Sequence, residues 1–119
     1  MSDAASPIGT ADALLRVGPQ EIIEKTVRDQ PYLFKDPSQY QRILKMIIGR
    51  LYRDQILRLE SYKGSQSPPL AQIELEQCNK LQAELRSMWM SVMDAINNPK
   101  HAEMIAELIR KTNATGPHD

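Results

Sequence analysis

The sequence predicts an all-α protein: a long antiparallel helical hairpin with shorter N- and C-terminal helices packed against it in a bundle-like arrangement. Aromatic residues make up only 5% of the 119 residues, and an aliphatic core suits helices packed on helices better than a β-sandwich or barrel. Two long segments, residues 37–63 and 68–96, carry helical start and stop signals and apolar residues at helical spacing. The turn that joins them is short, which makes the two helices antiparallel neighbours.

The N-terminal third predicts two short helices. We expect residues 1–9 to form an arm, flexible or pinned by a partner, and Thr10 to cap a helical turn that ends before Gly18. Pro19 suits the first position of a second helix, because its fixed backbone angle fits the helix and its missing N–H needs no partner there. That helix ends before Pro31, since the residue before a proline avoids the helical region.

The first long helix follows an apolar connector, residues 31–37, whose aromatic side chains must be covered by the core or by a partner. Asp36 is a capping residue and Pro37 takes the first helical position, so we expect the helix over residues 37–63, with Gly64 at its end. Its apolar face begins with Tyr40, Leu44, Ile47 and Leu51 and then drifts through Tyr52, Ile56 and Leu59.

The second long helix is predicted over residues 68–96, with Ser67 as its cap. Apolar residues alternate at spacings of three and four, as in a coiled-coil seam, at Cys78, Leu81, Leu85, Met88, Val92 and Ala95. Asn98 caps a last helix over residues 99–112, and residues 113–119 are a polar tail. Residues 10–112 therefore form a single helical domain.

Charge is unevenly distributed although the formal net charge is zero. Residues 42–63 hold six basic and two acidic side chains, a local charge of +4, whereas residues 1–36 and 70–96 each carry −2. A neutral total argues against a general polyanion binder, whose affinity depends on many Lys and Arg contacts to phosphates. The alternation of sign predicts that these segments lie against one another or against a partner.

The chain has one cysteine, Cys78, so no intrachain disulfide or cysteine cluster for a metal is available. Its N-terminal sequence lacks the basic and apolar segments of a secretory signal peptide, and no apolar run is long enough to span a membrane. We therefore expect a protein of the cytoplasm or of a large complex such as a virion.

Sequence signals for catalysis are missing. No HExxH, P-loop, GxSxG or GxGxxG motif occurs, and His101 and His118 are too far apart to form a local pair. Glu74, Glu76 and Glu84 could form a carboxylate site, but the ExxH spacing that such sites use in helical bundles does not occur. We predict no catalytic residues, no metal site and no cofactor, so the protein is not expected to be an enzyme.

Apolar side chains cover nearly the whole circumference of the helix at residues 43–52, whereas one antiparallel neighbour covers a stripe of about 100°. The rest must meet the shorter helices or another chain. Gly49 points to a close approach there, by a helix of this chain or of a partner, because glycine inside a helix costs roughly 1 kcal/mol.

Tryptophan often anchors interfaces and methionine adapts to irregular surfaces. The predicted partner interface comprises Tyr32, Phe34, Met46, Ile48, Tyr52, Trp89, Met90 and Met93. A second interpretation of Trp89 is that it closes the chain's own core beside Pro99.

Basic residues mark a possible phosphate-contacting stripe, because Arg42, Lys45 and Arg53 share one helical side with the space left by Gly49. The alternative is a solvated face with salt bridges to Asp54, Glu60 or the opposite helix. No helix-turn-helix, zinc-finger or basic-zipper spacing accompanies the stripe.

The tripeptide Leu51-Tyr52-Arg53, followed by Arg58, resembles the motif of the LYR-motif proteins of mitochondria. The resemblance implies a small helical adaptor that serves iron–sulfur assembly or respiratory complexes and binds an acylated carrier protein. It covers only residues 51–58. In that family the motif opens the first helix and a phenylalanine follows well downstream, whereas here the only phenylalanine, Phe34, precedes the motif.

The sequence thus predicts a non-enzymatic structural or adaptor subunit of a larger protein assembly, with a phage or viral particle as one setting. It would act through helix–helix interfaces with other subunits or with a second copy of itself. A nucleic-acid-binding protein that uses the basic helix at residues 42–63 is the alternative, and an LYR-type mitochondrial assembly adaptor is a lesser one.

Overall fold

The computed structural model describes residues 6–114, and within them the fold is all-α with five α-helices. The helices are α1 (Pro7–Leu15), α2 (Pro19–Asp29), α3 (Tyr40–Ser65), α4 (Gln72–Asn97) and α5 (Pro99–Ala114). Two short 3₁₀ turns, η2 (Pro31–Phe34) and η3 (Pro37–Gln39), connect α2 to α3. The predicted fold class is confirmed: α3 and α4 pack antiparallel, and the shorter terminal helices pack against them.

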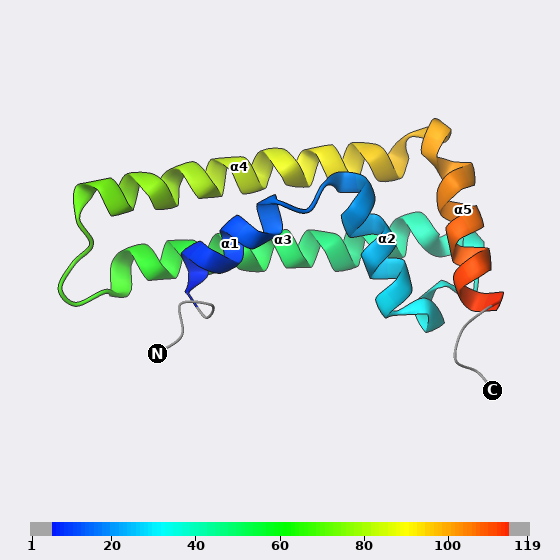
Figure 1. Cartoon of the computed structure of the whole chain (residues 1–119), viewed down its shortest axis with the longest axis horizontal. Coiled ribbons are helices and arrows are strands. Elements are labelled where there is room, and N and C mark those ends of the chain that lie inside the picture. Colours follow the sequence, from blue (N-terminus) through cyan, green and yellow to red (C-terminus); the bar gives the residue numbers. More distant parts are fainter. Residues whose placement is uncertain (1–5, 115–119) are drawn as a thin grey trace.

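The helices form a hairpin with one face covered by the N-terminal helices. Figure 1 shows α3 and α4 side by side along the long axis, with α1 and α2 lying across them and α5 turning away at the end of α4. Both α1 and α2 contact both long helices, and α5 packs against α2, α4 and η2. The N-terminal helices therefore complete the core on one face of the hairpin.

Three contacts fix the register between the long helices, and they pair Gln41 with Ile96, Gly49 with Trp89, and Ile56 with Gln82. Each step of seven residues forward along α4 is matched by a step of seven or eight residues back along α3. The two helices therefore stay in contact over most of their length with a constant antiparallel offset.

The heptad predicted on α4 faces the core. Its members Cys78, Leu81, Leu85 and Val92 are buried, and Met88 and Ala95 are half-buried. On α3 the buried apolar stripe instead runs through Leu44, Ile48, Tyr52, Ile56 and Leu59. The prediction was wrong for Leu51, which is 42% exposed. Its neighbour Tyr52 takes the core position, because α3 must face α4, α1 and α2 together rather than α4 alone.

Helix boundaries differ from the prediction at three N-termini. Helix α3 begins at Tyr40 rather than at residue 37, because Pro37–Gln39 forms the 3₁₀ turn η3 instead of the first turn of the α-helix. Helix α1 begins at Pro7 rather than near Thr10, because the Ser6 hydroxyl accepts a hydrogen bond from the Ile8 N–H at 3.2 Å. Helix α4 begins at Gln72 rather than at residue 68. Two consecutive prolines keep the preceding chain extended, and the Glu74 carboxylate accepts from the Ala71 N–H at 2.9 Å.

The remaining boundaries agree more closely. Asp36 caps the 3₁₀ turn that precedes α3, accepting from the Ser38 N–H at 3.1 Å, and Asn98 accepts from the Lys100 N–H at 2.9 Å at the start of α5. Helix α3 continues through Gly64 to Ser65, and α5 extends to Ala114, two residues beyond the predicted end. Residues 1–5 of the predicted arm and residues 115–119 of the predicted tail lie outside the described residues.

The apolar connector is covered by the chain itself. Phe34 is fully buried in η2, which packs against α2, α3 and α5. The Asn113 side-chain N–H donates to the Phe34 carbonyl at 3.3 Å and ties the end of α5 to the connector. Tyr32 points outward and is 63% exposed.

Replacing Tyr52 with Phe tests the packing of α3. Within residues 6–114 the buried Tyr52 hydroxyl has no hydrogen-bond partner, and its burial raises the pKa of the phenol. Tyr52→Phe removes that desolvated hydroxyl and should raise the free energy of unfolding by about 1 kcal/mol in urea titrations. Tyr32→Phe, which removes an exposed hydroxyl, is the control and should change little.

The stability difference between Tyr52→Phe and the wild type should also depend on pH. Above pH ~10 an unfolded tyrosine releases its proton, whereas buried Tyr52 retains it, so wild-type stability falls as pH rises through that range. Tyr52→Phe lacks this contribution, so its advantage over the wild type should widen with pH. A less stable Tyr52→Phe protein would contradict the assignment of this hydroxyl as unpaired.

Candidate protein interface

The face of the hairpin that carries Trp89 and Gly49 is open. The spacing of three and four residues along each helix places neighbouring side chains on one side, and the contact between Trp89 and Gly49 brings the two rows together. We call this surface the open face, formed by Arg42, Lys45, Met46, Gly49 and Arg53 of α3 and by Arg86, Trp89, Met90 and Met93 of α4. It combines an apolar centre with a basic border.

The centre of the open face is the indole of Trp89, which crosses from α4 onto the backbone of α3. A Cβ placed on Gly49 would lie 3.6 Å from the Trp89 atoms Cζ2 and Nε1, an ordinary van der Waals contact. The predicted close approach at Gly49 is therefore confirmed, and a side chain of the same polypeptide makes it. Trp89 remains half-buried, and within residues 6–114 its indole N–H has no protein acceptor.

Methionines surround the indole. Met46 is 57% exposed and Met90 is 68% exposed, while Met93, one turn beyond Trp89, is half-buried. Methionine is unbranched and polarisable, so it can adapt its shape to a partner surface. Four apolar side chains on this side of the hairpin are thus half-buried or exposed to solvent.

Basic side chains border this apolar centre. Arg42, Arg53 and Arg86 are exposed and Lys45 is half-buried. None of them forms an ion pair or hydrogen bond within the part of the chain that the structure describes. The alternative of salt bridges to Asp54 or Glu60 is therefore not observed for these residues.

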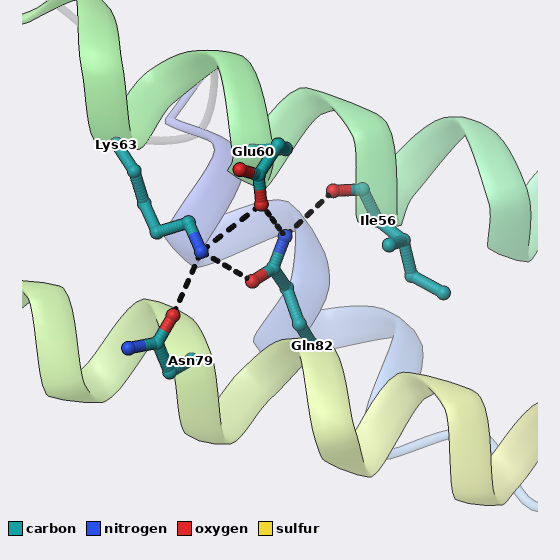
Figure 2. Close-up of polar contacts among 5 residues, drawn as sticks. All are labelled: Ile56, Glu60, Lys63, Asn79 and Gln82. Carbon is teal, nitrogen blue, oxygen red and sulfur yellow. Dashed lines mark hydrogen bonds and ion pairs between the residues drawn. The ribbon is translucent and has the colours of Figure 1, made fainter.

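A polar cluster closes the end of the open face nearest the α3–α4 turn (Figure 2). Gln82 is buried between the helices, and its amide N–H groups donate to the Ile56 carbonyl and to the Glu60 carboxylate, each at 3.1 Å. The Lys63 ammonium donates to the side-chain oxygens of Gln82 at 2.9 Å and Asn79 at 2.7 Å, and lies 3.0 Å from Glu60. Both polar ends of the Gln82 amide are satisfied.

This cluster sets the charge state of Glu60. The hydrogen bond from Gln82 lowers the pKa of the Glu60 carboxyl, and the hydrogen bond and positive charge of Lys63 lower it further. Glu60 is therefore ionised and already engaged by Lys63. The positive charge of Arg86 also lowers the Glu60 pKa, whereas Arg42, Lys45 and Arg53 form no ion pair among the described residues.

The structure sorts the predicted interface residues into two groups. Trp89 lies against Gly49, and helical spacing places Met46, Met90 and Met93 on the same side of the hairpin, with Arg42, Lys45 and Arg53 beside them. Phe34, Ile48 and Tyr52 are fully buried by their own chain, so they cannot contact a partner while this fold persists and are removed from the interface prediction. Tyr32 is exposed, but it lies on η2 rather than on the hairpin.

The sequence reasoning did not include Arg86 in the site. It lies three residues before Trp89, so helical spacing alone would have placed it on the same face. The LYR tripeptide does not form one surface, because Tyr52 is buried between the exposed Leu51 and Arg53.

No protein-family model, curated protein or solved structure matches this chain. Across residues 6–114, no helix combines the length and apolar character needed to cross a membrane. Among the same residues, no three His, Cys, Asp or Glu side chains gather closely enough to hold a metal ion.

Substitutions at Gly49 test the packing beneath Trp89. Gly49→Ala adds a methyl group at ordinary contact distance and improves helix propensity, so we expect the free energy of unfolding to rise by up to about 1 kcal/mol. Gly49→Leu must displace the indole and should shift its fluorescence emission to the red. Trp89 is the only tryptophan in the chain, so emission reports directly on this site. Loss of stability in Gly49→Ala would contradict the observed spacing.

Acid titration tests the cluster at Gln82. Because the folded-state pKa of Glu60 is lowered, its stabilising contribution is complete above the ordinary carboxyl pKa, about 4.3, and is lost as pH falls through the lowered value. Gln82→Leu removes the largest cause, so the Glu60 pKa should rise in a carbon-13 NMR titration and the acid dependence of stability should weaken. Glu84→Gln is the control, since Glu84 is not among the groups that shift the Glu60 pKa and its loss should leave the titration of Glu60 unchanged.

Proposed function

We propose that this protein is a non-enzymatic structural or adaptor subunit of a larger protein assembly and that it binds other subunits through the open face. The observation that carries the proposal is the half-buried indole of Trp89 between exposed Met46 and Met90. Tryptophan is enriched among the residues that dominate binding energy, and methionine is enriched in interfaces. A phage or viral particle remains one predicted setting for such a subunit.

Burial of this surface by a partner would release substantial free energy. Fully burying a methionine side chain contributes about 1.5–3 kcal/mol, and two methionines here are more than half exposed. The Trp89 ring is already held against Gly49, so a partner would lose little side-chain entropy in covering it. An interface centred on these residues therefore has a preorganised anchor.

A nucleic-acid-binding protein is the second candidate, and the exposed Arg42 and Arg53 support it because neither forms an ion pair within the described residues. Phosphate binding would make affinity fall steeply with salt concentration. A protein interface centred on apolar side chains would depend on salt only weakly. Mobility-shift assays at several salt concentrations distinguish the two functions.

Substitution of Met90 tests the proposed function. Met90→Arg and Ile73→Arg change two exposed apolar residues of α4, 68% and 75% exposed, so neither should disturb the fold. Only Met90 lies on the open face. In affinity capture from the source organism with quantitative mass spectrometry, Met90→Arg should reduce recovery of partner subunits by about tenfold or more, as expected for losing about 1.5 kcal/mol of burial. Ile73→Arg should capture them as the wild type does.

The opposite results are equally clear. Equal recovery by both variants would place the binding surface elsewhere on the molecule. A wild-type chain that captures no subunit and is a lone monomer in light scattering would refute the role in an assembly.

A further inference from the structure

Resting on the proposed function, we infer that the open face binds an amphipathic helix that covers Trp89 with its apolar stripe and carries Asp and Glu on its flanks. Three features support this occupant: the shape of the surface, its charge, and the poor fit of other occupants.

The shape of the open face suits a helix. It lies along two antiparallel helices, and Gly49 leaves the space in which the indole of Trp89 lies across α3. Met46 stands on one side of this contact and Met90 on the other, on different helices. Exposed apolar residues on two adjacent antiparallel helices suit an amphipathic helix, which presents apolar anchors at spacings of three and four residues.

The charge of the open face requires acidic flanks. The border carries four basic residues, Arg42, Lys45, Arg53 and Arg86, whereas Glu60 is already held by Lys63 and Gln82. On α4, Asp94 follows Met90 by one turn, and neither Asp94 nor Glu84 forms an ion pair among the described residues. The face therefore has more positive charge than its own carboxylates can balance, and acidic residues on a partner would complement it.

No ion pair between helices neutralises this charge within residues 6–114, although Arg86 of α4 lies close enough to Glu60 of α3 to lower its pKa. Every ion pair observed among residues 6–114 joins two residues three or four apart within a single helix, as in Arg16–Asp12, Lys25–Asp29, Arg28–Glu24, Lys63–Glu60 and Arg110–Glu107. The basic helix α3 thus packs against the acidic helix α4 without forming ion pairs to it. Its remaining positive charge faces solvent and is accessible to a partner.

A second copy of the chain is a poor occupant of this face. In a two-fold dimer the same patch meets itself, so the basic border of one copy would oppose the basic border of the other. Nucleic acid is also a poor occupant, because a phosphate backbone offers nothing apolar to bury Met46, Trp89 and Met90. An acidic amphipathic helix offers apolar side chains to the centre of the open face and negative charge to its basic border.

Selection from a peptide library tests this inference with the full chain. The probe is a displayed library of amphipathic helices with a fixed leucine stripe and flanking positions drawn from Glu, Lys, Gln and Ser. Selection on the wild type should enrich Glu at the flanks. Selection on the double variant Arg42→Glu/Arg53→Glu should enrich Lys, because the same border is then acidic. Arg58→Glu/Lys80→Glu, an equal charge change on exposed residues outside the open face, should keep the wild-type preference.

Direct binding uses Trp89 as the reporter. A selected acidic peptide should shift the tryptophan emission to the blue, since it excludes water from the only indole in the chain. Its dissociation constant should rise about tenfold or more in Arg42→Glu/Arg53→Glu and stay within a factor of about two in Arg58→Glu/Lys80→Glu. Circular dichroism of both double variants should match that of the wild type, because all four residues are exposed.

Several outcomes would overturn the inference. These are failure of the wild type to enrich any peptide, enrichment without charge preference, an identical preference on Arg42→Glu/Arg53→Glu, or binding that leaves Trp89 emission unchanged. Tight, salt-sensitive binding of a duplex DNA or RNA oligonucleotide with no peptide binding would assign the face to nucleic acid. If subunit capture still depends on Met90 while the peptides show no charge preference, the proposed function stands and only the acidic helix is wrong.

Discussion

The close contact between the Trp89 ring and the backbone of Gly49 is the constraint on which both the hairpin and its binding surface depend. A side chain at position 49 larger than a methyl group would push the indole away from α3. With glycine there, the ring lies across both long helices, so one part of it packs while another part faces solvent. The residue that fixes the register is therefore the same residue that anchors the open face.

Side-chain amides secure this register and attach the shorter helices without using buried charges. Four side-chain amides each donate to a backbone carbonyl of another helix or turn. The pairs are Gln41 to Ile96, Gln55 to Pro7, Gln82 to Ile56 and Asn113 to Phe34. A slip of the hairpin by one turn would leave the buried Gln82 amide without its partners, at a cost of about 1–3 kcal/mol. Neutral amides can thus specify an arrangement that surface ion pairs, worth less than about 1 kcal/mol, could not.

Sequence periodicity was sufficient for the fold class and for the core face of α4, because its heptad leaves a single apolar stripe. It was insufficient for α3, where apolar residues surround the helix and the spacing fits more than one face. The structure buries Ile48 and Tyr52 rather than Leu51, since α1 and α2 supply a second packing surface that no local pattern of α3 encodes. Phe34 was likewise assigned to a partner because the sequence does not show that α5 returns to cover it.

The candidate site was predictable in its apolar half and less so in its electrostatics. Composition and helical spacing were enough to select Trp89, Met90, Met93 and Met46. They could not show whether the basic side chains beside these residues form ion pairs, because that depends on three-dimensional contacts. The sequence shows a neutral chain with a positive segment between two negative ones, which by itself suggests neutralisation within the fold. The structure instead confines ion pairs to neighbours within single helices, so packing α3 against α4 leaves positive charge on the surface beside an apolar centre. The net charge of zero therefore does not mean that the surface is evenly neutral. The open face combines exposed apolar side chains with positive charge, and an apolar, negatively charged partner complements it better than solvent does.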